Sequence, residues 1–214
     1  MGFEYLTNVP LTQARKEYLE RLVSGGFGSK AETIPVFESC GRVTAKAVYA
    51  HICAPHYAAS AMDGVAVSAK ETFGATETTP VTLNPDQFLV LDTGDPIPED
   101  KDAVIMVEDI VKNGDGSITI HAAAAPWQHI RQIGEDVCAG EMILPSHMTV
   151  SPAAIGAMIA GGVLEIEVIR KPVVGIIPTG DEIIPPCTDP KPGDILEFNG
   201  SIFSAMVRSW GAEA

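Results

Sequence analysis

Apolar residues recur at helical spacing in four stretches of the chain. The first, 11–23, carries an apolar stripe and has Thr12 at its start, where a side-chain oxygen can cap a helix. The others are 39–50, 151–162 and 199–210; the third begins with Ser-Pro and ends with Gly-Gly, which are typical helix-start and helix-end residues. We therefore predict four helices over these ranges, with a flexible glycine-rich linker over 24–29 after the first.

Short apolar runs separated by Gly, Pro and Asp fill the middle third of the chain. This pattern predicts a small all-β module, in which Asn113-Gly114-Asp115-Gly116 is a typical hairpin turn. Two more strand-like runs, 33–37 and 164–169, lie outside it. The strands predicted inside the module are 65–67, 81–83, 88–91, 103–111 and 117–122.

Near the end of the chain, 173–177 is an almost unbroken apolar run, which is typical of a strand buried in a parallel sheet. A proline-rich loop and the helix predicted over 199–210 follow it. A strand, a loop and a helix form the first part of a β-α-β unit, and the next strand is missing from the sequence. The pattern therefore leads us to expect a last domain that is cut short.

Charge and composition exclude several classes of protein. The 214 residues carry a net charge of −14, and such an acidic surface repels the phosphates of nucleic acid. There is no signal-peptide pattern and no run of about 20 apolar residues to span a bilayer, so we expect a cytoplasmic protein without a membrane segment. The sequence contains neither Gly-x-Ser-x-Gly nor His-Glu-x-x-His, the motifs of many esterases and zinc proteases.

The four cysteines do not have the spacing of a zinc site. They are Cys40, Cys53, Cys138 and Cys187, and no Cys-x-x-Cys pair occurs among them. In a cytoplasmic protein we expect reduced and mostly buried thiols.

Two strand-like runs end in the same tripeptide. Thr93-Gly94-Asp95 follows one of them, and Thr179-Gly180-Asp181, continued by Glu182, follows the other. Because open α/β sheets bind ligands at the carboxyl ends of their strands, each tripeptide could offer a hydroxyl, a backbone amide and a carboxylate to a ligand. An ordinary turn explains them equally well, since Gly and Asp are common turn residues.

Two further loops carry polar residues that suit anion or metal binding. Ser60-Ala61-Met62-Asp63-Gly64 precedes a predicted strand, and taken alone it is more easily explained as a turn. Arg131, with Glu135 and Asp136 close behind it, follows the β module. A carboxylate there could help to hold hydrated Mg²⁺ while Arg131 faces an oxyanion, or the residues could form a plain surface ion pair.

Taken together and in order, these segments resemble the N-terminal portion of the molybdopterin molybdotransferase family, which includes bacterial MoeA proteins and the gephyrin E domain. Cys40-Gly41-Arg42-Val43 is also similar to a family segment, whereas Val65 stands where the family usually has Tyr, and Ala58-Ala59 where it has polar residues. The five matching blocks are 60–64, 93–98 with 102–109, 130–136, 179–182 and 199–201.

The resemblance implies an α/β and β multidomain fold. Residues 1–50 and 140–170 would form an elongated α/β domain, and 51–139 a small β module inserted into it. Residues 171–214 would be the start of a three-layer α/β domain that binds molybdopterin. Because the family's glycine-rich pterin-binding segment has no counterpart in the sequence, this chain alone is not expected to complete the family's reaction.

The resemblance also implies an enzyme of molybdenum cofactor biosynthesis, a transferase that inserts molybdate into adenylylated molybdopterin with the help of Mg²⁺. It implies a homodimer with the site between two subunits, and acceptor molybdoenzymes as further partners. The alternative is a non-catalytic dimerising scaffold, or a module that binds molybdate or the pterin. The catalytic residues and metal ligands implied are Asp63, Asp136 and Glu182. The substrate-binding residues implied are Ser60, Thr93, Gly94, Arg131, Thr179, Gly180 and Asp181.

Overall fold

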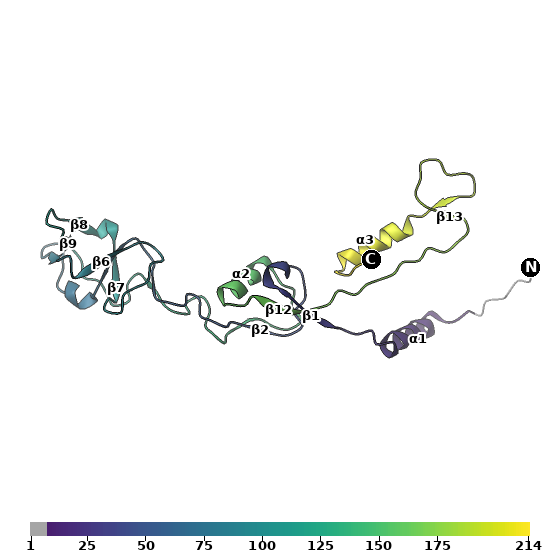
Figure 1. Ribbon diagram of the computed structural model, residues 1–214, viewed down its shortest axis with the longest axis horizontal. Coiled ribbons are helices and arrows are strands. Elements are labelled where there is room, and N and C mark those ends of the chain that lie inside the picture. Colours follow the sequence, from purple (N-terminus) through teal and green to yellow (C-terminus); the bar gives the residue numbers. More distant parts are fainter. Residues whose placement is uncertain (1–7) are drawn as a thin grey trace, which may run out of the picture.

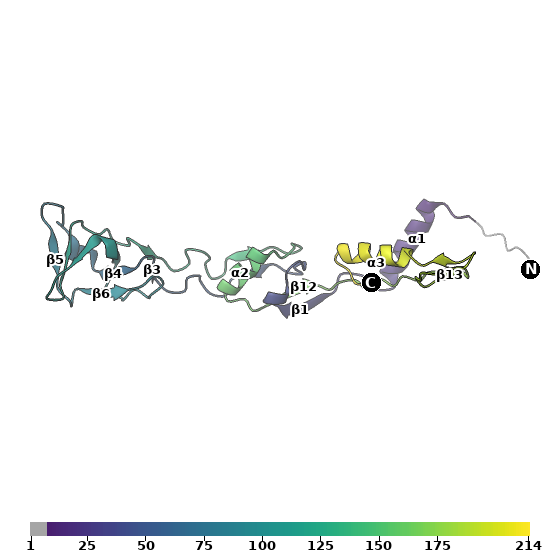
Figure 2. The same ribbon diagram turned by 90° about the horizontal axis from the view of Figure 1, so that it is seen from above.

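Small groups of helices and strands follow one another along the length of an extended molecule (Figures 1 and 2). The computed structural model describes residues 8–214. The β module forms one end, a unit built around α2 lies in the middle, and α1 lies with the C-terminal elements at the other end. The chain is thus an α/β multidomain protein with several small sheets.

The β module contains two three-stranded antiparallel sheets. β4 is the central strand of one sheet and β9 the central strand of the other. The predicted strands are confirmed, except that the run over 103–111 is two strands in different sheets, separated by the 3₁₀ turn Val107–Asp109. The strands are β6 (Phe88–Leu91), β4 (Gly64–Val67) and β7 (Ala103–Met106) in the first sheet, and β5 (Val81–Leu83), β9 (Ile118–Ile120) and β8 (Ile110–Lys112) in the second.

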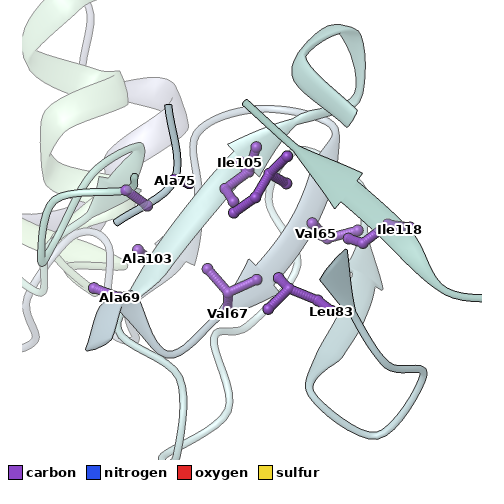
Figure 3. Close-up of a cluster of buried hydrophobic side chains, with 10 residues drawn as sticks. Val65, Val67, Ala69, Ala75, Leu83, Ala103, Ile105 and Ile118 are labelled. Atoms are coloured by element: carbon purple, nitrogen blue, oxygen red, sulfur yellow. The ribbon is translucent and has the colours of Figure 1, made fainter. Parts of the chain in front are cut away.

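Aliphatic side chains fill the space between these two sheets (Figure 3). Val65 and Val67 of β4 point into it and meet Leu83 and Ile118 of the other sheet. Each such side chain contributes about 1.5–3 kcal/mol when it is fully buried. Val65, which stands where the resembled family has Tyr, is 1% exposed, so this difference alters the packing of the core and not a solvent-facing loop.

The middle unit has a second apolar core, formed by two short antiparallel sheets and one helix. α2 (Pro152–Ala160) confirms the helix predicted over 151–162, and the Ser151 hydroxyl accepts a hydrogen bond from the Ala154 N–H at 3.2 Å. Met158 of α2 is fully buried in this core. The paired strands are β1 (Ala31–Pro35) with β12 (Glu165–Ile169), and β2 (Val48–Tyr49) with β11 (Met142–Leu144).

Residues 39–50 do not form the helix that the sequence predicts. Val43 makes a β-bridge with Thr149, and Thr44 makes one with Val168. The fully buried Thr44 also donates its hydroxyl to the Pro145 carbonyl at 2.8 Å. These contacts with a distant part of the chain suit β-branched residues better than a local helix does. The strand predicted over 33–37 is present as β1, which begins and ends two residues earlier.

The predicted helices near both ends of the described chain are present, but the cap of the first helix and the strand predicted over 173–177 are not as expected. α1 (Leu11–Ser24) and α3 (Asn199–Ser209) confirm the terminal helices, but Pro10 and not Thr12 occupies the cap position of α1. The apolar run 173–177 is not a buried strand, because its one β-bridge, between Val173 and Glu213, provides too little pairing to form a sheet there. The described C-terminal strands are β13 (Ile183–Ile184) and β14 (Ile195–Leu196), which are parallel.

Two extended segments connect the β module to the middle unit (Figure 1). We call these residues, 50–57 and 132–141, the neck. Ala54 and Val137 hold its two segments together through a pair of backbone hydrogen bonds of 2.8 and 3.2 Å. The four cysteines are free as predicted, but three are exposed and Cys53 is half-buried, so the expectation of mostly buried thiols is wrong. Within residues 8–214, no helix has the length and apolar character needed to cross a membrane.

Candidate functional site

The structure joins two of the predicted motifs at the inner end of the β module. β3 (Ala59–Ser60) lies beside the segment that follows β6, and the Ser60 N–H donates to the Asp95 carbonyl at 2.9 Å. The Gly94 N–H donates in turn to the Ser60 carbonyl at 2.9 Å. The loop over 60–64 and the loop over 92–96 are therefore adjacent, although about thirty residues separate them in the sequence.

Asp63 and Thr93 form the contact that links these two loops. The Thr93 N–H and the Thr93 hydroxyl both donate to Oδ1 of Asp63, at 2.7 and 2.8 Å. The backbone hydrogen bond, and then the hydroxyl bond, lower the pKa of the Asp63 carboxyl below its ordinary value. Both residues are exposed, and no described residue donates a hydrogen bond to Oδ2. Asp63 therefore presents an ionised carboxylate oxygen to solvent.

Buried groups beneath Asp63 fix the shape of its loop. The Ser60 side chain is fully buried, and its hydroxyl donates to the Met62 carbonyl at 2.5 Å. The Val107 N–H donates to the Asp63 carbonyl at 3.0 Å. Gly64 lies so close to β7 that an added Cβ would be 2.0 Å from the Ile105 carbonyl oxygen. Ser60 and Gly64 thus hold the loop in place.

Tyr57 and His129 also support the two loops, and the sequence analysis missed both. The Tyr57 hydroxyl donates to the Gly94 carbonyl at 2.9 Å, and Gly94 has a φ of 93°, which favours glycine. The His129 carbonyl accepts the Ala61 N–H at 2.9 Å, and His129 has the unusual φ of 54°. No spacing or motif marks either residue, because their roles depend on contacts between distant parts of the chain.

The Arg131 motif lies next to the same loops. β10 (Ile130–Arg131) pairs with β3, so that Arg131 stands opposite Ala59. The Arg131 guanidinium donates through Nη2 to both oxygens of Asp136, at 2.7 and 2.6 Å, and its Nε lies 3.5 Å from Glu135. The hydrogen bond with Asp136 and its charge raise the pKa of Arg131. Asp136 is already engaged in an ion pair with Arg131, whereas Asp63 has no cationic partner among the described residues.

The fourth predicted motif does not reach these loops within one chain. Thr179, Gly180, Asp181 and Glu182 lead into β13, which lies at the other end of the molecule from the β module (Figures 1 and 2). Thr179 lines a pocket of about 390 Å³ together with residues of β14 and α3. Gly180 has a φ of 139°, and a Cβ added to it would lie 2.7 Å from Oε1 of Glu182. Among residues 8–214, no three potential metal-ligating side chains gather in one place.

Comparisons with known proteins identify the family of this chain. Residues 9–162 match the family described as the MoeA N-terminal region (domain I and II). The chain is 36% identical over 196 residues to molybdopterin molybdenumtransferase 2 of Mycobacterium tuberculosis, covering 84% of this chain and 48% of that protein. It is 32% identical over 205 residues to the molybdopterin molybdenumtransferase of Haemophilus influenzae, covering 88% of this chain and 49% of that protein.

A solved structure has the same arrangement of elements. The molybdopterin biosynthesis MoeA protein from Pyrococcus horikoshii superposes with a TM-score of 0.77 and 32% identity, over 86% of this chain and 53% of that one. The chain spans about half the length of the curated relatives it matches. Since the family match covers most of its residues, the chain belongs to the MoeA family, whose N-terminal region with domains I and II corresponds to residues 9–162.

Proposed function

We propose that this chain forms the N-terminal part of a molybdopterin molybdenumtransferase, in which Asp63 and Thr93 take part in inserting molybdate into adenylylated molybdopterin. The observation that carries the proposal is the exposed, ionised Asp63 carboxylate, which Thr93 holds by two hydrogen bonds. The printed names of the relatives from M. tuberculosis and H. influenzae support the choice of reaction.

The free Oδ2 of Asp63 suits a magnesium ion that is shared with substrate phosphates. Mg²⁺ in phosphate-handling enzymes is commonly bound by one or two carboxylates together with substrate phosphates and water. When bound, the ion supplies stabilisation of the charge that develops on a leaving phosphate. Asp136 fits this role less well, because both its oxygens accept hydrogen bonds from Arg131. The predicted set of Asp63, Asp136 and Glu182 is not assembled within a single chain.

The protein's own residues would orient the substrates. Thr93 keeps Asp63 ionised and directs its second oxygen outward, while the Gly94 backbone, which has no side chain, lets an oxyanion approach closely. Arg131 is held by Glu135 and Asp136 beside the same loops. It offers its remaining N–H groups to an anionic group of the substrate.

The proposal includes the domain division and partners that the family resemblance implies. Residues 1–50 with 140–170 would form the elongated domain, 51–139 the inserted β module, and 171–214 the beginning of the molybdopterin-binding domain. A second copy of the chain would bring its Glu182, with Thr179, Gly180 and Asp181, to the loops around Asp63. Acceptor molybdoenzymes would receive the finished cofactor.

The proposal can be tested by assaying molybdate insertion in the full-length protein with the substitution Asp63→Asn. The amide keeps the shape of the side chain but removes its charge, so we expect activity to fall by roughly a hundredfold or more, the order seen when a charge-stabilising group is removed. Asp115→Asn is a matched control, because Asp115 also accepts an N–H and a hydroxyl on one oxygen, at 3.0 and 2.6 Å.

Equal activity of the two variants would contradict the assignment of Asp63. If the unmodified full-length protein itself inserted no molybdenum, the alternative of a non-catalytic dimerising scaffold or binding module would replace the enzymatic one. Circular dichroism and gel filtration of both variants check that the fold and the oligomeric state are unchanged.

A further inference from the structure

The neck brings two cysteines from distant parts of the sequence directly across from each other. Cys53 precedes Ala54, and Cys138 follows Val137, the two residues that form the antiparallel bridge of the neck. Ala54 and Val137 exchange both of their backbone hydrogen bonds. In an antiparallel ladder the next pair along is then a non-hydrogen-bonded pair, in which the Cα atoms are only about 4.5 Å apart.

The two sulfur atoms lie on the same side of the neck. If Gly134 carried a Cβ, it would lie 2.8 Å from the Sγ of Cys138 and 3.6 Å from the Sγ of Cys53. The Gly134 carbonyl accepts a hydrogen bond from the Cys138 thiol at 3.4 Å, and the Ala139 N–H donates to the Cys53 sulfur at 3.3 Å. Gly134, with a φ of 76°, thus leaves space in which the two thiols face each other.

This arrangement suits a cross-strand disulfide, because both sulfurs face the space beside Gly134. Disulfides join residues whose Cα atoms are about 4.4–6.8 Å apart, a range that includes the usual spacing of a cross-strand pair. Cys138 is exposed, which gives an oxidant access to its sulfur, and Cys53 is half-buried beside it. Cys40 and Cys187 lie outside the neck, in the middle unit and in the proline-rich loop after β13.

We propose that Cys53 and Cys138 form a reversible disulfide that responds to peroxides. One cysteine loses its proton, and its thiolate attacks a peroxide oxygen, which breaks the O–O bond and gives a sulfenic acid and hydroxide; the hydroxide takes up the lost proton to form water. The second thiolate attacks that sulfur and expels hydroxide, which takes up the released proton. In total, two thiols and one hydrogen peroxide give one disulfide and two waters. The two electrons that the sulfurs lose reduce the peroxide.

The disulfide would fasten the two segments of the neck to each other. In the reduced protein, several backbone hydrogen bonds join them, including those of the Ala54–Val137 bridge and the one from the Gly134 N–H to the Pro55 carbonyl, together with a small group of apolar side chains. Asp136, which holds Arg131, lies two residues from Cys138. Oxidation would therefore restrict both the motion of the β module relative to the middle unit and the turn that carries the Arg131–Asp136 pair.

Peptide mapping of the full-length protein tests this proposal. The reduced protein is treated with hydrogen peroxide, its remaining thiols are alkylated, and it is digested without a reductant for mass spectrometry. We expect one linked peptide pair that contains Cys53 and Cys138, with two fewer alkylated cysteines than in the reduced protein and full recovery after dithiothreitol. The substitutions Cys53→Ser and Cys138→Ser should abolish the linked pair, whereas Cys40→Ser and Cys187→Ser should leave it intact.

Alkylation of both Cys53 and Cys138 after peroxide treatment would overturn the proposal, and so would their separate oxidation to sulfinic acids. These results come from the unsubstituted protein, so they do not depend on whether a serine variant folds. Hydrogen exchange adds a second readout. The neck amides of Ala54, Gly134 and Val137 should exchange more slowly after oxidation, but not in peroxide-treated Cys138→Ser. Unchanged exchange in the oxidised protein would contradict the fastening of the neck.

Discussion

Asp63 and Asp115 each accept two hydrogen bonds from one neighbouring residue. A backbone N–H and a hydroxyl donate to the same carboxylate oxygen, from Thr93 in one case and Ser117 in the other. Both contacts lower the pKa of the carboxyl. Asp115 and Ser117 are two residues apart in a hairpin turn, whereas Asp63 and Thr93 connect two loops. Protonation of Asp63 therefore weakens a tertiary contact, and protonation of Asp115 weakens only a turn.

The substitution Thr93→Val should raise the pKa of Asp63 only part of the way to its ordinary value. The backbone N–H of Thr93 has the largest effect on this pKa, and it remains in the variant. For Asp115 the hydroxyl of Ser117 has the largest effect, so Ser117→Ala should return the pKa of Asp115 a larger share of the way to its ordinary value. Carbon-13 NMR titration of the two carboxyls measures both values. Full return of the pKa of Asp63 to the ordinary aspartate value in Thr93→Val would contradict this account.

The sign of the pH effect on stability follows from the lowered pKa of Asp63. The Asp63–Thr93 contact contributes its full stabilisation above the pKa of aspartate in the unfolded chain, about 4. The contribution is lost as the pH falls through the lower pKa of the folded protein. The link between the two loops should therefore persist in mildly acidic solution.

At the scale of elements, β4 holds the β module together. Its side chains are buried on both faces: Val65 and Val67 contact the core between the sheets, and Ala66 contacts a second group that includes Leu91 and Ile130. β4 also pairs with β6 and β7 along its whole length. A change in its backbone therefore affects both sheets and the loop that carries Asp63.

The substitution Gly64→Ala should lower the free energy of unfolding by about 1–3 kcal/mol or more, as overpacking in a core does. The new Cβ would meet the Ile105 carbonyl oxygen at 2.0 Å, and neither backbone can move without disturbing the pairing of β4 with β7. Urea denaturation of both proteins measures the difference. Gly114→Ala is the control, because a Cβ there has no neighbour within 4 Å. If Gly114→Ala lowered the free energy of unfolding by as much, the effect would come from glycine replacement in general and not from the contact with Ile105.

The sequence predicted most elements whose signals are local. Short apolar runs bounded by turn residues placed the strands of the β module, and Ser151-Pro152 placed the start of α2. The failures are segments whose structure depends on distant partners. Residues 39–50 have a helical pattern but pair with 148–150 and 167–169, and 173–177 has the composition of a strand without enough pairing to become one.

The candidate site was predictable as a set of residue types, but not as a geometry. Asp63, Thr93 and Arg131 stand in recognisable motifs, and the structure brings their loops together. The supporting roles of Tyr57 and His129 have no local signal. The Tyr57 hydroxyl contacts Gly94 and the His129 carbonyl contacts Ala61, and in each pair the two residues are far apart in the sequence. The full engagement of Asp136 by Arg131 likewise depends on the conformation of the turn at Gly134.

At the scale of the whole molecule, the elongated shape separates the two groups of predicted site residues. Asp63 lies in the β module at one end and Glu182 beside β13 at the other (Figures 1 and 2). α1 has no buried residue and exposes apolar side chains that include Leu11, Tyr18 and Val23. Such a helix is suited to a partner surface. Both features favour the proposed arrangement, in which a second copy completes the site.

Mixed dimers of the full-length protein test this arrangement. If each site takes Asp63 from one copy and Glu182 from the other, an equal mixture of Asp63→Asn and Glu182→Gln chains should recover about a quarter of the unmodified activity, because half of the dimers are mixed and each keeps one intact site. A mixture of Asp63→Asn with Thr93→Val should recover nothing beyond its components, since both changes affect the same loops. A shared site would be contradicted if the mixture of Asp63→Asn with Glu182→Gln recovered no activity, whether or not the mixture with Thr93→Val did.

The neck has a consequence for the chain entropy of the middle unit. β1 and β12 are paired from Ala31↔Ile169 to Pro35↔Glu165, so the whole β module lies within the loop that their pairing closes. The entropic cost of closing a flexible loop grows only with the logarithm of its length, about 0.6 kcal/mol for each doubling. The folded module also shortens the effective loop, because the two segments of the neck enter and leave the module side by side. The middle unit therefore holds an insertion longer than itself. The added loop-closure entropy costs less free energy than exposing one buried leucine, which costs about 1.5–3 kcal/mol.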